Sequence, residues 1–188
     1  PIRLGYSRLQ VEGCVEMEQE ETGENIVSEY QQAVDRISRL GQSRELIFGA
    51  GANSTLFHYG DTLSNLDRIP NEISRLTRLE SLDLSGTQVS NLEPISRLRG
   101  LQRLDISRTK VTDLRPIENI RSLRHIFMDG TDVEDLLPLS GIGNLETISI
   151  SGTKIRVLDG ILSCVNLTRI NAASSHLLSI EGVDGLVY

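Results

Sequence analysis

Residue types that can carry out catalysis recur at one spacing in the middle of the chain. Asp83 and Asp105 lie 22 residues apart, and His125 and several serines follow at related positions. Two carboxylates on neighbouring structural units could share a proton or a metal ion, and Ser, His and Asp together could form a hydrolytic triad. However, no third metal ligand accompanies the carboxylates, and no nucleophile elbow or oxyanion-hole motif accompanies the serines. The sequence therefore favours a polar surface on which Arg103 neutralises the aspartates, and an intrinsic hydrolase or metalloenzyme is the least supported hypothesis.

The spacing of 22 residues extends over the whole C-terminal part of the chain. A hydroxyl column runs through Thr87, Thr109, Thr131, Thr153 and Ser175. A hydrophobic column runs through Leu82, Leu104, Ile126, Ile148 and Ile170. A third column holds Pro94, Pro116 and Pro138, and then Gly160 and Gly182. The repeat reads L-x-x-L-x-L-x-x-T-x-V-x-x-L-x-P-I-x-x-L-x-x, and a fixed period in this range is the signature of a solenoid.

This pattern resembles the leucine-rich repeat family, in particular the short 22-residue repeats of bacterial internalins and of Roco-type GTPases. The resemblance is strong over residues 79–188 and weaker over roughly 45–78. It implies an α/β solenoid, a right-handed superhelix with a short-stranded parallel sheet on its concave face and an N-terminal capping helix. The chain departs from the family where most members carry Asn and this one carries the hydroxyl column. Because a threonine hydroxyl both donates and accepts, we expect these hydroxyls to bond inward and form a shorter structural ladder.

The chain divides into four segments by composition and period. They are an acidic flexible arm (1–23), an N-terminal cap (24–55), a degenerate first repeat (56–78) and five regular repeats (79–188). The cap is expected to contain an amphipathic helix over 24–40, which covers the first coil, and a strand over 45–48. Further strands are expected at 81–85, 103–107, 125–129, 147–151 and 169–173. A single helical or 3₁₀ turn is expected at each proline position.

The concave face can be deduced from the alternation of side chains along each strand. Its candidate partner-binding residues are Phe127, His125, Arg103, Asp105, Asp83, Asp129, Arg169 and Asn171. Phe127 stands in a column otherwise filled by Asp, Ser and Asn. It either packs on its neighbours His125 and Arg103 or anchors a partner, since aromatics and arginines are enriched at interface hot spots.

Charge and composition exclude several other classes of protein. The net charge is −7, and residues 1–30 alone hold seven glutamates against two arginines. This acidity argues against general nucleic-acid binding, which needs a basic surface. No apolar run is long enough to span a membrane, and no signal peptide opens the chain. The cysteines Cys14 and Cys164 lack metal-ligand spacing, so we expect an intracellular, cytoplasmic protein without cofactor or metal.

A basic stripe lies away from the concave face and could attract an acidic partner or the acidic arm. It consists of Arg75, Arg78, Arg97, Arg99, Arg121 and Arg124.

Two functional hypotheses remain. The first is a non-catalytic protein–protein interaction module that binds a partner protein on the concave face. The second, implied by the Roco-type resemblance, is a targeting or regulatory fragment of a larger signalling protein or enzyme. The C-terminal end bears on both, because no cap follows the fifth repeat and Val183 and Leu186 occupy core positions. An uncapped end exposes apolar surface, so we expect either a piece of a longer protein or self-association through this end.

Overall fold

The structure, a computed structural model, describes residues 28–41, 43–49 and 62–178. The predicted acidic arm (1–23), Cys14 and the C-terminal Val183 and Leu186 lie outside these residues. Within the described ranges, no helix is both long enough and apolar enough to cross a membrane.

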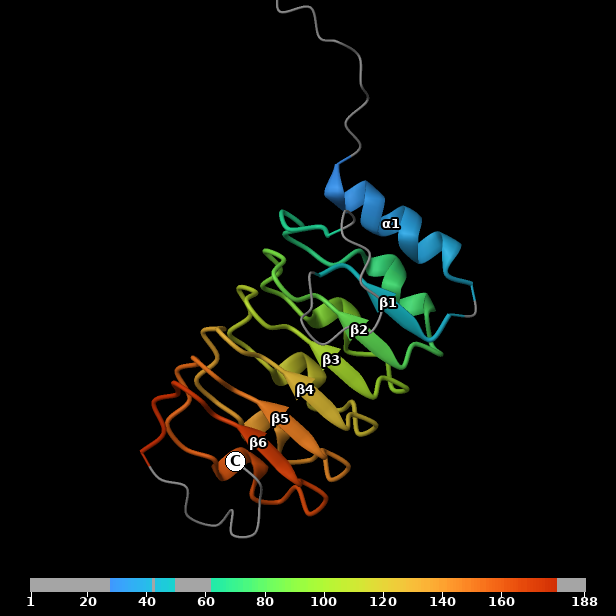
Figure 1. Cartoon of the computed structure of the whole chain (residues 1–188). Helices are drawn as coiled ribbons and strands as arrows, with labels where there is room; N and C mark the ends of the chain where they lie inside the picture. Colours follow the sequence, from blue (N-terminus) through green and yellow to red (C-terminus); the bar gives the residue numbers. More distant parts are fainter. Residues whose placement is uncertain (1–27, 42, 50–61, 179–188) are drawn as a thin grey trace, which may run out of the picture.

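In the described part of the chain, six short strands form one parallel sheet in chain order (Figure 1). They are β1 (Glu45–Ile47), β2 (Ser81–Asp83), β3 (Arg103–Asp105), β4 (His125–Phe127), β5 (Thr147–Ser149) and β6 (Arg169–Asn171). Neighbouring strands pair in the predicted register, with Leu82 opposite Leu104 and Leu104 opposite Ile126. The first interval is longer, because 36 residues separate Glu45 from its partner Ser81. The interval between β1 and β2 therefore spans the end of the predicted cap and the whole predicted degenerate repeat.

The strands begin where the sequence predicts but contain three residues, where the sequence predicted four for β1 and five for β2 to β6. Beyond these three residues, backbone bonds between coils continue, as from the N–H of Leu84 to the carbonyl of Asp105 at 2.8 Å. The N–H groups of Ser85 and Ser107 donate instead to the carboxylates of Asp83 and Asp105. The chain then turns through a left-handed position after each of the strands β2 to β6. This position is occupied by Gly86, Arg108, Gly130, Gly152 and Ser174, all with positive φ. An extended strand does not continue through such a backbone conformation.

Each coil returns through a short 3₁₀ turn on the far side of the sheet. These turns are η1 (Asn71–Arg75), η2 (Glu93–Ile95), η3 (Arg115–Ile117), η4 (Leu137–Leu139) and η5 (Asp159–Ile161). The prolines lie in the first turn of η2, η3 and η4, which confirms the expected single turn at this column. The side-chain oxygens of Asn91, Asp113 and Asp135 accept the N–H two residues later, at 2.8 to 2.9 Å. These Asx bonds fix the entry to the turns.

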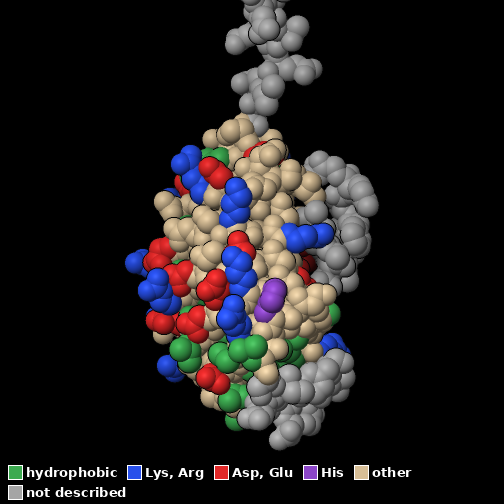
Figure 2. Space-filling model, turned by 90° about the vertical axis from the view of Figure 1, so that its left-hand side faces the viewer, with side chains coloured by type: hydrophobic (Ala, Val, Ile, Leu, Met, Phe, Trp, Pro, Cys, Tyr) green, Lys and Arg blue, Asp and Glu red, His purple; other side chains and the backbone are tan. Residues whose placement is uncertain are grey.

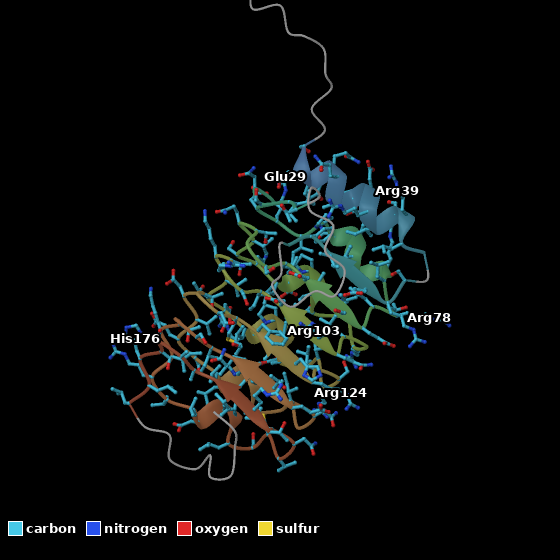
Figure 3. All side chains as sticks on the ribbon, viewed as in Figure 1. Glu29, Arg39, Arg78, Arg103, Arg124 and His176 are labelled. Carbon is cyan, nitrogen blue, oxygen red and sulfur yellow. The ribbon has the colours of Figure 1, made fainter. Side chains whose placement is uncertain are left out.

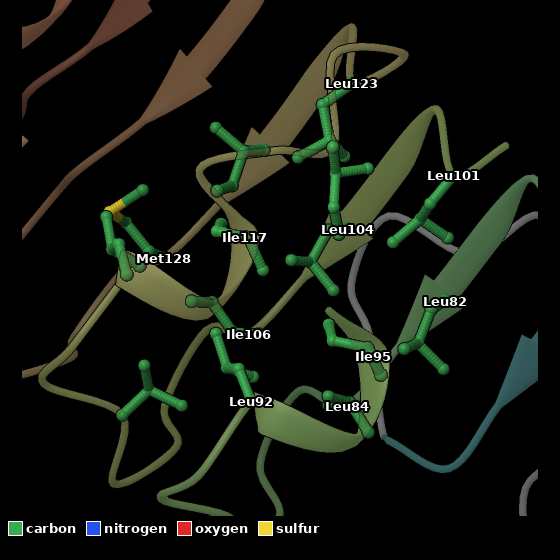
Figure 4. Close-up of a cluster of buried hydrophobic side chains, with 14 of the residues drawn as sticks. Leu82, Leu84, Leu92, Ile95, Leu101, Leu104, Ile106, Ile117, Leu123 and Met128 are labelled. Atoms are coloured by element: carbon green, nitrogen blue, oxygen red, sulfur yellow. The ribbon is translucent and has the colours of Figure 1, made fainter. Parts of the chain in front are cut away.

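The core is a continuous stack between the sheet and the 3₁₀ turns, one layer per coil (Figure 4). The central strand position is fully or almost fully buried in every regular coil, from Leu82 to Ile170. Each coil contacts mainly its neighbours, as in other solenoids. Cys164 lies within this stack, and burial raises the pKa of its thiol.

The helix α1 (Glu29–Arg39) covers the N-terminal end of the stack (Figure 1). It ends one residue before the predicted boundary, and it buries Ala33 and Ile37. The same region also bonds the outer edge of β1. The Arg36 guanidinium donates to the carbonyl of Ile47 at 3.0 Å, and the Ser43 hydroxyl donates to the carbonyl of Glu45 at 3.1 Å. These bonds occupy groups that could otherwise pair with another strand.

Candidate partner-binding face

The outward side chains of the strands form two columns across the sheet, which we call the sheet face. The first column is Ser81, Arg103, His125, Thr147 and Arg169, and the second is Asp83, Asp105, Phe127, Ser149 and Asn171. Parallel strands lie about 4.8 Å apart, so each column is a row of near neighbours. The sheet therefore brings together seven of the eight predicted binding residues, and the eighth, Asp129, lies two residues beyond Phe127.

Arg103 and Phe127 form a stacked pair on the sheet face, and Figure 3 labels Arg103 over the middle of the sheet. The guanidinium carbon lies 4.5 Å from the centre of the ring. Such a cation–π contact contributes about 0.5–1 kcal/mol at an exposed site. Phe127 is only half-buried, so the ring packs on Arg103 and still presents surface to solvent. The two predicted roles of Phe127, packing on a neighbour and anchoring a partner, are therefore compatible.

The surroundings of His125 are predominantly cationic. Partial burial lowers the pKa of this imidazole, and the positive charges of Arg103, Arg124 and Arg169 lower it further. Glu146 acts in the opposite direction, but its carboxylate is bonded to Arg124 at 2.6 Å. The imidazole is therefore held in its neutral form over a wider pH range than a free histidine.

Asp83 and Asp105 are buried, which corrects the expectation of an exposed, solvated pair. Their exposed fractions are 8% and 3%. Asp83 Oδ1 accepts both the N–H of Ser85 at 2.8 Å and its hydroxyl at 2.7 Å. Gly49 packs so closely on this turn that a Cβ there would lie 2.6 Å from Asp83 Oδ1. The Asp-x-Ser spacing is an Asx-turn signal, and it could have indicated from the sequence that these carboxylates bond to their own backbone.

The buried carboxylates bond mainly to neighbouring serines. Burial raises the pKa of Asp105, and the bonds from Ser107 oppose that rise. Among the described residues, no group of three or more His, Cys, Asp or Glu side chains is placed to hold a metal ion. Two serine hydroxyls that could have completed a triad donate elsewhere, Ser85 to Asp83 and Ser149 to Asp129.

A chain of polar side chains crosses the last three strands. The Ser149 hydroxyl donates to Asp129 Oδ1 at 2.6 Å and accepts from the Asn171 amide at 3.0 Å. The N–H of Ser151 also donates to Asp129 Oδ1, at 2.8 Å. These bonds fix Asp129 and Asn171 in place, while Arg169 in the neighbouring column is exposed.

The threonine column bonds inward, but within each coil rather than between coils. The hydroxyls of Thr87, Thr109, Thr131 and Thr153 donate to the carbonyl three residues earlier, at 2.6 to 2.7 Å. For Ser175, the N–H donates to the carbonyl of Ala172 at 3.2 Å. Side chains bridge coils at a column that sequence reasoning missed. Its members Ser122, Asn144 and Asn166 donate to carbonyls of the preceding coil at 2.6 to 2.9 Å.

The side of the molecule seen in Figure 2, turned by 90° from the view of Figure 1, carries charges of both signs and hydrophobic side chains near one end. Figure 2 shows Lys and Arg beside Asp and Glu, with hydrophobic side chains gathered toward the C-terminal coils. Ion pairs of this mixed type are Arg115–Asp113 at 2.8 Å and Lys154–Asp132 at 2.9 Å. Exposed pairs of this kind contribute little to stability or specificity. The exposed hydrophobic residues of the last coils include Leu137, Val157, Leu162 and Val165.

The same coil architecture occurs in solved bacterial structures. The chain is similar to internalin C2 from Listeria monocytogenes (23% identity, TM-score 0.59), with 66% of this chain and 61% of that one covered. A leucine-rich-repeat protein from Leptospira interrogans has 22% identity and a TM-score of 0.60, with 69% and 35% covered. Internalin F from Listeria monocytogenes has 23% identity and a TM-score of 0.50, with 66% and 46% covered.

The chain thus spans about three fifths of internalin C2 and smaller shares of the other two. In sequence, it matches no family model and no curated protein. The structural similarities show that the chain has the leucine-rich-repeat fold.

Proposed function

We propose that this leucine-rich-repeat solenoid is a non-catalytic protein-interaction module that binds its partner on the sheet face between β3 and β6. The observation that carries the proposal is the Arg103–Phe127 stack, which leaves an aromatic ring half-exposed in a column of polar residues. Aromatic and arginine side chains contribute most strongly to protein interfaces when they lie at the centre of a contact patch. His125, Arg169 and Asn171 lie on the same face, His125 opposite Arg103 and the other two on β6.

The face is already ordered before a partner arrives. The sheet holds the backbone, the stack restrains Arg103 and Phe127, and the Asp129–Ser149–Asn171 bonds restrain the polar rim. Binding to an ordered surface costs less side-chain entropy, roughly 0.5–1.5 kcal/mol for each long side chain that is already restrained. This preorganisation suits a binding surface and needs no catalytic group.

The burial of Asp83 and Asp105 moves the expected contact area toward the C-terminal coils. These two carboxylates are bonded to their own turns and are almost inaccessible. The binding surface is therefore centred on Phe127 and extends over β5 and β6, where Arg169 and Asn171 are exposed.

Affinity capture from a cell lysate tests this proposal. Wild type is compared with an Arg103→Ala/Phe127→Ala variant, and both proteins are first checked for equal helical signal and a folded melting transition. The matched control is Arg97→Ala/Val165→Ala, which removes an exposed arginine and an exposed hydrophobic residue away from the sheet face. Proteins lost only from the sheet-face variant support the proposal. Identical captures by wild type and the sheet-face variant would overturn it.

A further inference from the structure

Four exposed arginines of the basic stripe lie at the corner where each coil passes from its 3₁₀ turn to its strand. We call them the corner arginines, and they are Arg75, Arg97, Arg99 and Arg121. They form two pairs at equivalent positions of neighbouring coils, 22 residues apart. The coils are in close contact here, because a Cβ on Gly100 would lie 3.3 Å from the carbonyl oxygen of Thr77. Positive charges of successive coils therefore lie next to one another along this corner.

The carboxylates of the same coils do not form ion pairs with the corner arginines. Glu80, which precedes β2, is paired with Arg44 at 2.7 Å. The acidic residues of the 3₁₀ turns and their ends are Glu72, Glu93 and Glu118. Within the described ranges, none of these three carboxylates forms an ion pair with a corner arginine. The surface therefore presents guanidinium groups that are free to bind a carboxylate.

The chain itself contains a segment of complementary charge. Residues 11–23 of the acidic arm hold five glutamates and no Lys or Arg, and these glutamates are Glu12, Glu16, Glu18, Glu20 and Glu21. The segment lies outside the described ranges and precedes Ser28, the N-cap of α1. Because like charges in a run repel one another, contact with a basic surface lowers the electrostatic free energy of both partners.

We propose that residues 11–23 bind the corner arginines of the same chain through their glutamates. This contact goes beyond the proposed function, since it lies away from the sheet face and leaves that face open. Exposed ion pairs are individually weak. Covalent linkage, however, makes the encounter intramolecular, with an effective concentration of about millimolar. Several weak pairs are then sufficient, and a separate acidic protein at lower concentration competes poorly for the same surface.

The connecting chain is long enough for this contact. α1 has 11 residues, which corresponds to a length of about 16 Å. Figure 3 shows Arg39, at the C-terminal end of α1, on the same side of the molecule as Arg78, so the arm must cover about one helix length to reach the corner. Measured back from Ser28, an extended chain reaches up to about 24 Å at Glu21 and about 55 Å at Glu12.

A nitroxide label on Cys14, which lies within residues 11–23, tests the contact in the full chain. Cys164 is buried and the pKa of its thiol is raised, so it reacts slowly at neutral pH, and Cys14→Ser checks that no label enters there. We expect the label to broaden the NMR signals of the backbone amides around Arg99 and Arg121 in about 0.05 M salt. The signals should recover in about 0.5 M salt, where the Debye length falls from about 14 Å to about 4 Å.

Two double variants locate the contact. Arg97→Gln/Arg99→Gln removes two corner arginines, whereas Arg108→Gln/Arg156→Gln removes two exposed arginines elsewhere and changes the net charge equally. Broadening around Arg121 should fall in the first variant and persist in the second. Equal broadening in both variants, or none in wild type at low salt, would overturn the proposal. If label on one molecule broadens the signals of unlabelled, isotope-enriched molecules in a mixture, the arm binds a second copy and the intramolecular contact is wrong.

Shielding of the corner arginines from other anions gives a second readout. The probe is heparin resin, a sulfated polyanion, and the measured quantity is the salt concentration at which the full chain elutes. The arm is neutralised by Glu16→Gln/Glu18→Gln/Glu20→Gln/Glu21→Gln. We expect Arg97→Gln/Arg99→Gln to lower the elution salt more in this background than in the wild-type background, because the neutralised arm no longer covers the corner. Equal lowering in the two backgrounds would contradict the contact.

Discussion

Arg103 and Phe127 stack on each other although they are not opposite one another in the sheet. The register pairs Arg103 with His125 and Asp105 with Phe127. The Arg103 guanidinium therefore reaches diagonally from β3 to the neighbouring β4, where it lies 4.5 Å from the centre of the Phe127 ring. The contact therefore joins the two outward columns of the sheet face. Because of it, a half-exposed aromatic ring and a cationic side chain lie at the same point.

A double-mutant cycle measures the energy of this pair. Arg103→Ala, Phe127→Leu and the double variant are compared with wild type by urea unfolding. We expect a coupling free energy of about 0.5–1 kcal/mol, because leucine keeps apolar bulk but has no ring to attract the cation. The cycle is needed because Arg103 also makes another interaction, which the single variant would remove as well. Strictly additive single effects would contradict a stabilising stack.

The buried carboxyl of Asp105 should reduce stability at neutral pH. Burial raises its pKa above the ordinary value of 3.8, so the folded state binds the proton more tightly than the unfolded state. The cost of the charged form is then fully present above the folded pKa, and it disappears as the pH falls toward 3.8. Asp105→Asn keeps an oxygen that can accept the N–H of Ser107. We expect this variant to be more stable than wild type at pH 7.5, with the difference shrinking as the pH approaches 4.

Asp105→Ala separates the charge from the hydrogen bond. It removes the charge and also the acceptor of the Ser107 N–H, which should cost about 1–3 kcal/mol at every pH. Chemical denaturation at pH 7.5, 6, 5 and 4 measures both variants. A stability difference between wild type and Asp105→Asn that is constant over this range would show that the raised pKa of Asp105 is not the cause.

The hydroxyl column should stabilise each coil by a small, additive amount. The Thr131 hydroxyl donates to the carbonyl of Met128 at 2.7 Å, and this carbonyl also accepts the Thr131 N–H at 3.3 Å. Since one bond remains in Thr131→Val, we expect a cost of about 1 kcal/mol, near the lower end for a lost hydrogen bond. Thr87→Val lies two coils away, so the two effects should add to about 2 kcal/mol. Thr112→Val, at an exposed position, serves as the control. If Thr112→Val destabilises the protein as much as Thr131→Val, the loss of the buried hydroxyl bond does not explain the effect.

The period of the sequence predicted the fold because every regular coil must bury the same set of apolar side chains. Leu82 and its equivalents can only be buried if successive coils stack in register, so the strand starts and the pairing of Leu82 with Leu104 followed from spacing alone. The prolines predicted the short far-side turns for a similar local reason, since proline fixes φ and suits the first turn.

The candidate binding face was less predictable, because the alternation of side chains along a strand gives the direction of each side chain but not its solvent accessibility. Asp83 and Phe127 occupy the same column, yet one is buried and bonded to Ser85 while the other is half-exposed. The diagonal contact of Arg103 likewise depends on side-chain reach, which spacing does not contain. The bridges from Asn144 and Asn166 to the preceding coil were visible as a polar column, but a polar column at a coil corner could equally be solvated surface.

Gly160 is a position where the repeat pattern and the structure predict opposite effects. The repeat has proline at this column in three earlier coils, so a consensus argument would treat Gly160→Pro or Gly160→Ala as stabilising. In the structure, a Cβ at this position would lie 2.0 Å from the carbonyl carbon and oxygen of Leu136. These are backbone atoms of the preceding coil, which cannot rotate away as a side chain can. We therefore expect Gly160→Ala to destabilise the protein by about 2–3 kcal/mol through overpacking.

Gly143→Ala is the matched control, because a Cβ there meets no atom within 4 Å, and its effect should stay within about 0.5 kcal/mol. Thermal and urea unfolding of the three proteins decide the matter: equal stability of both alanine variants would mean that η4 and η5 do not pack this closely.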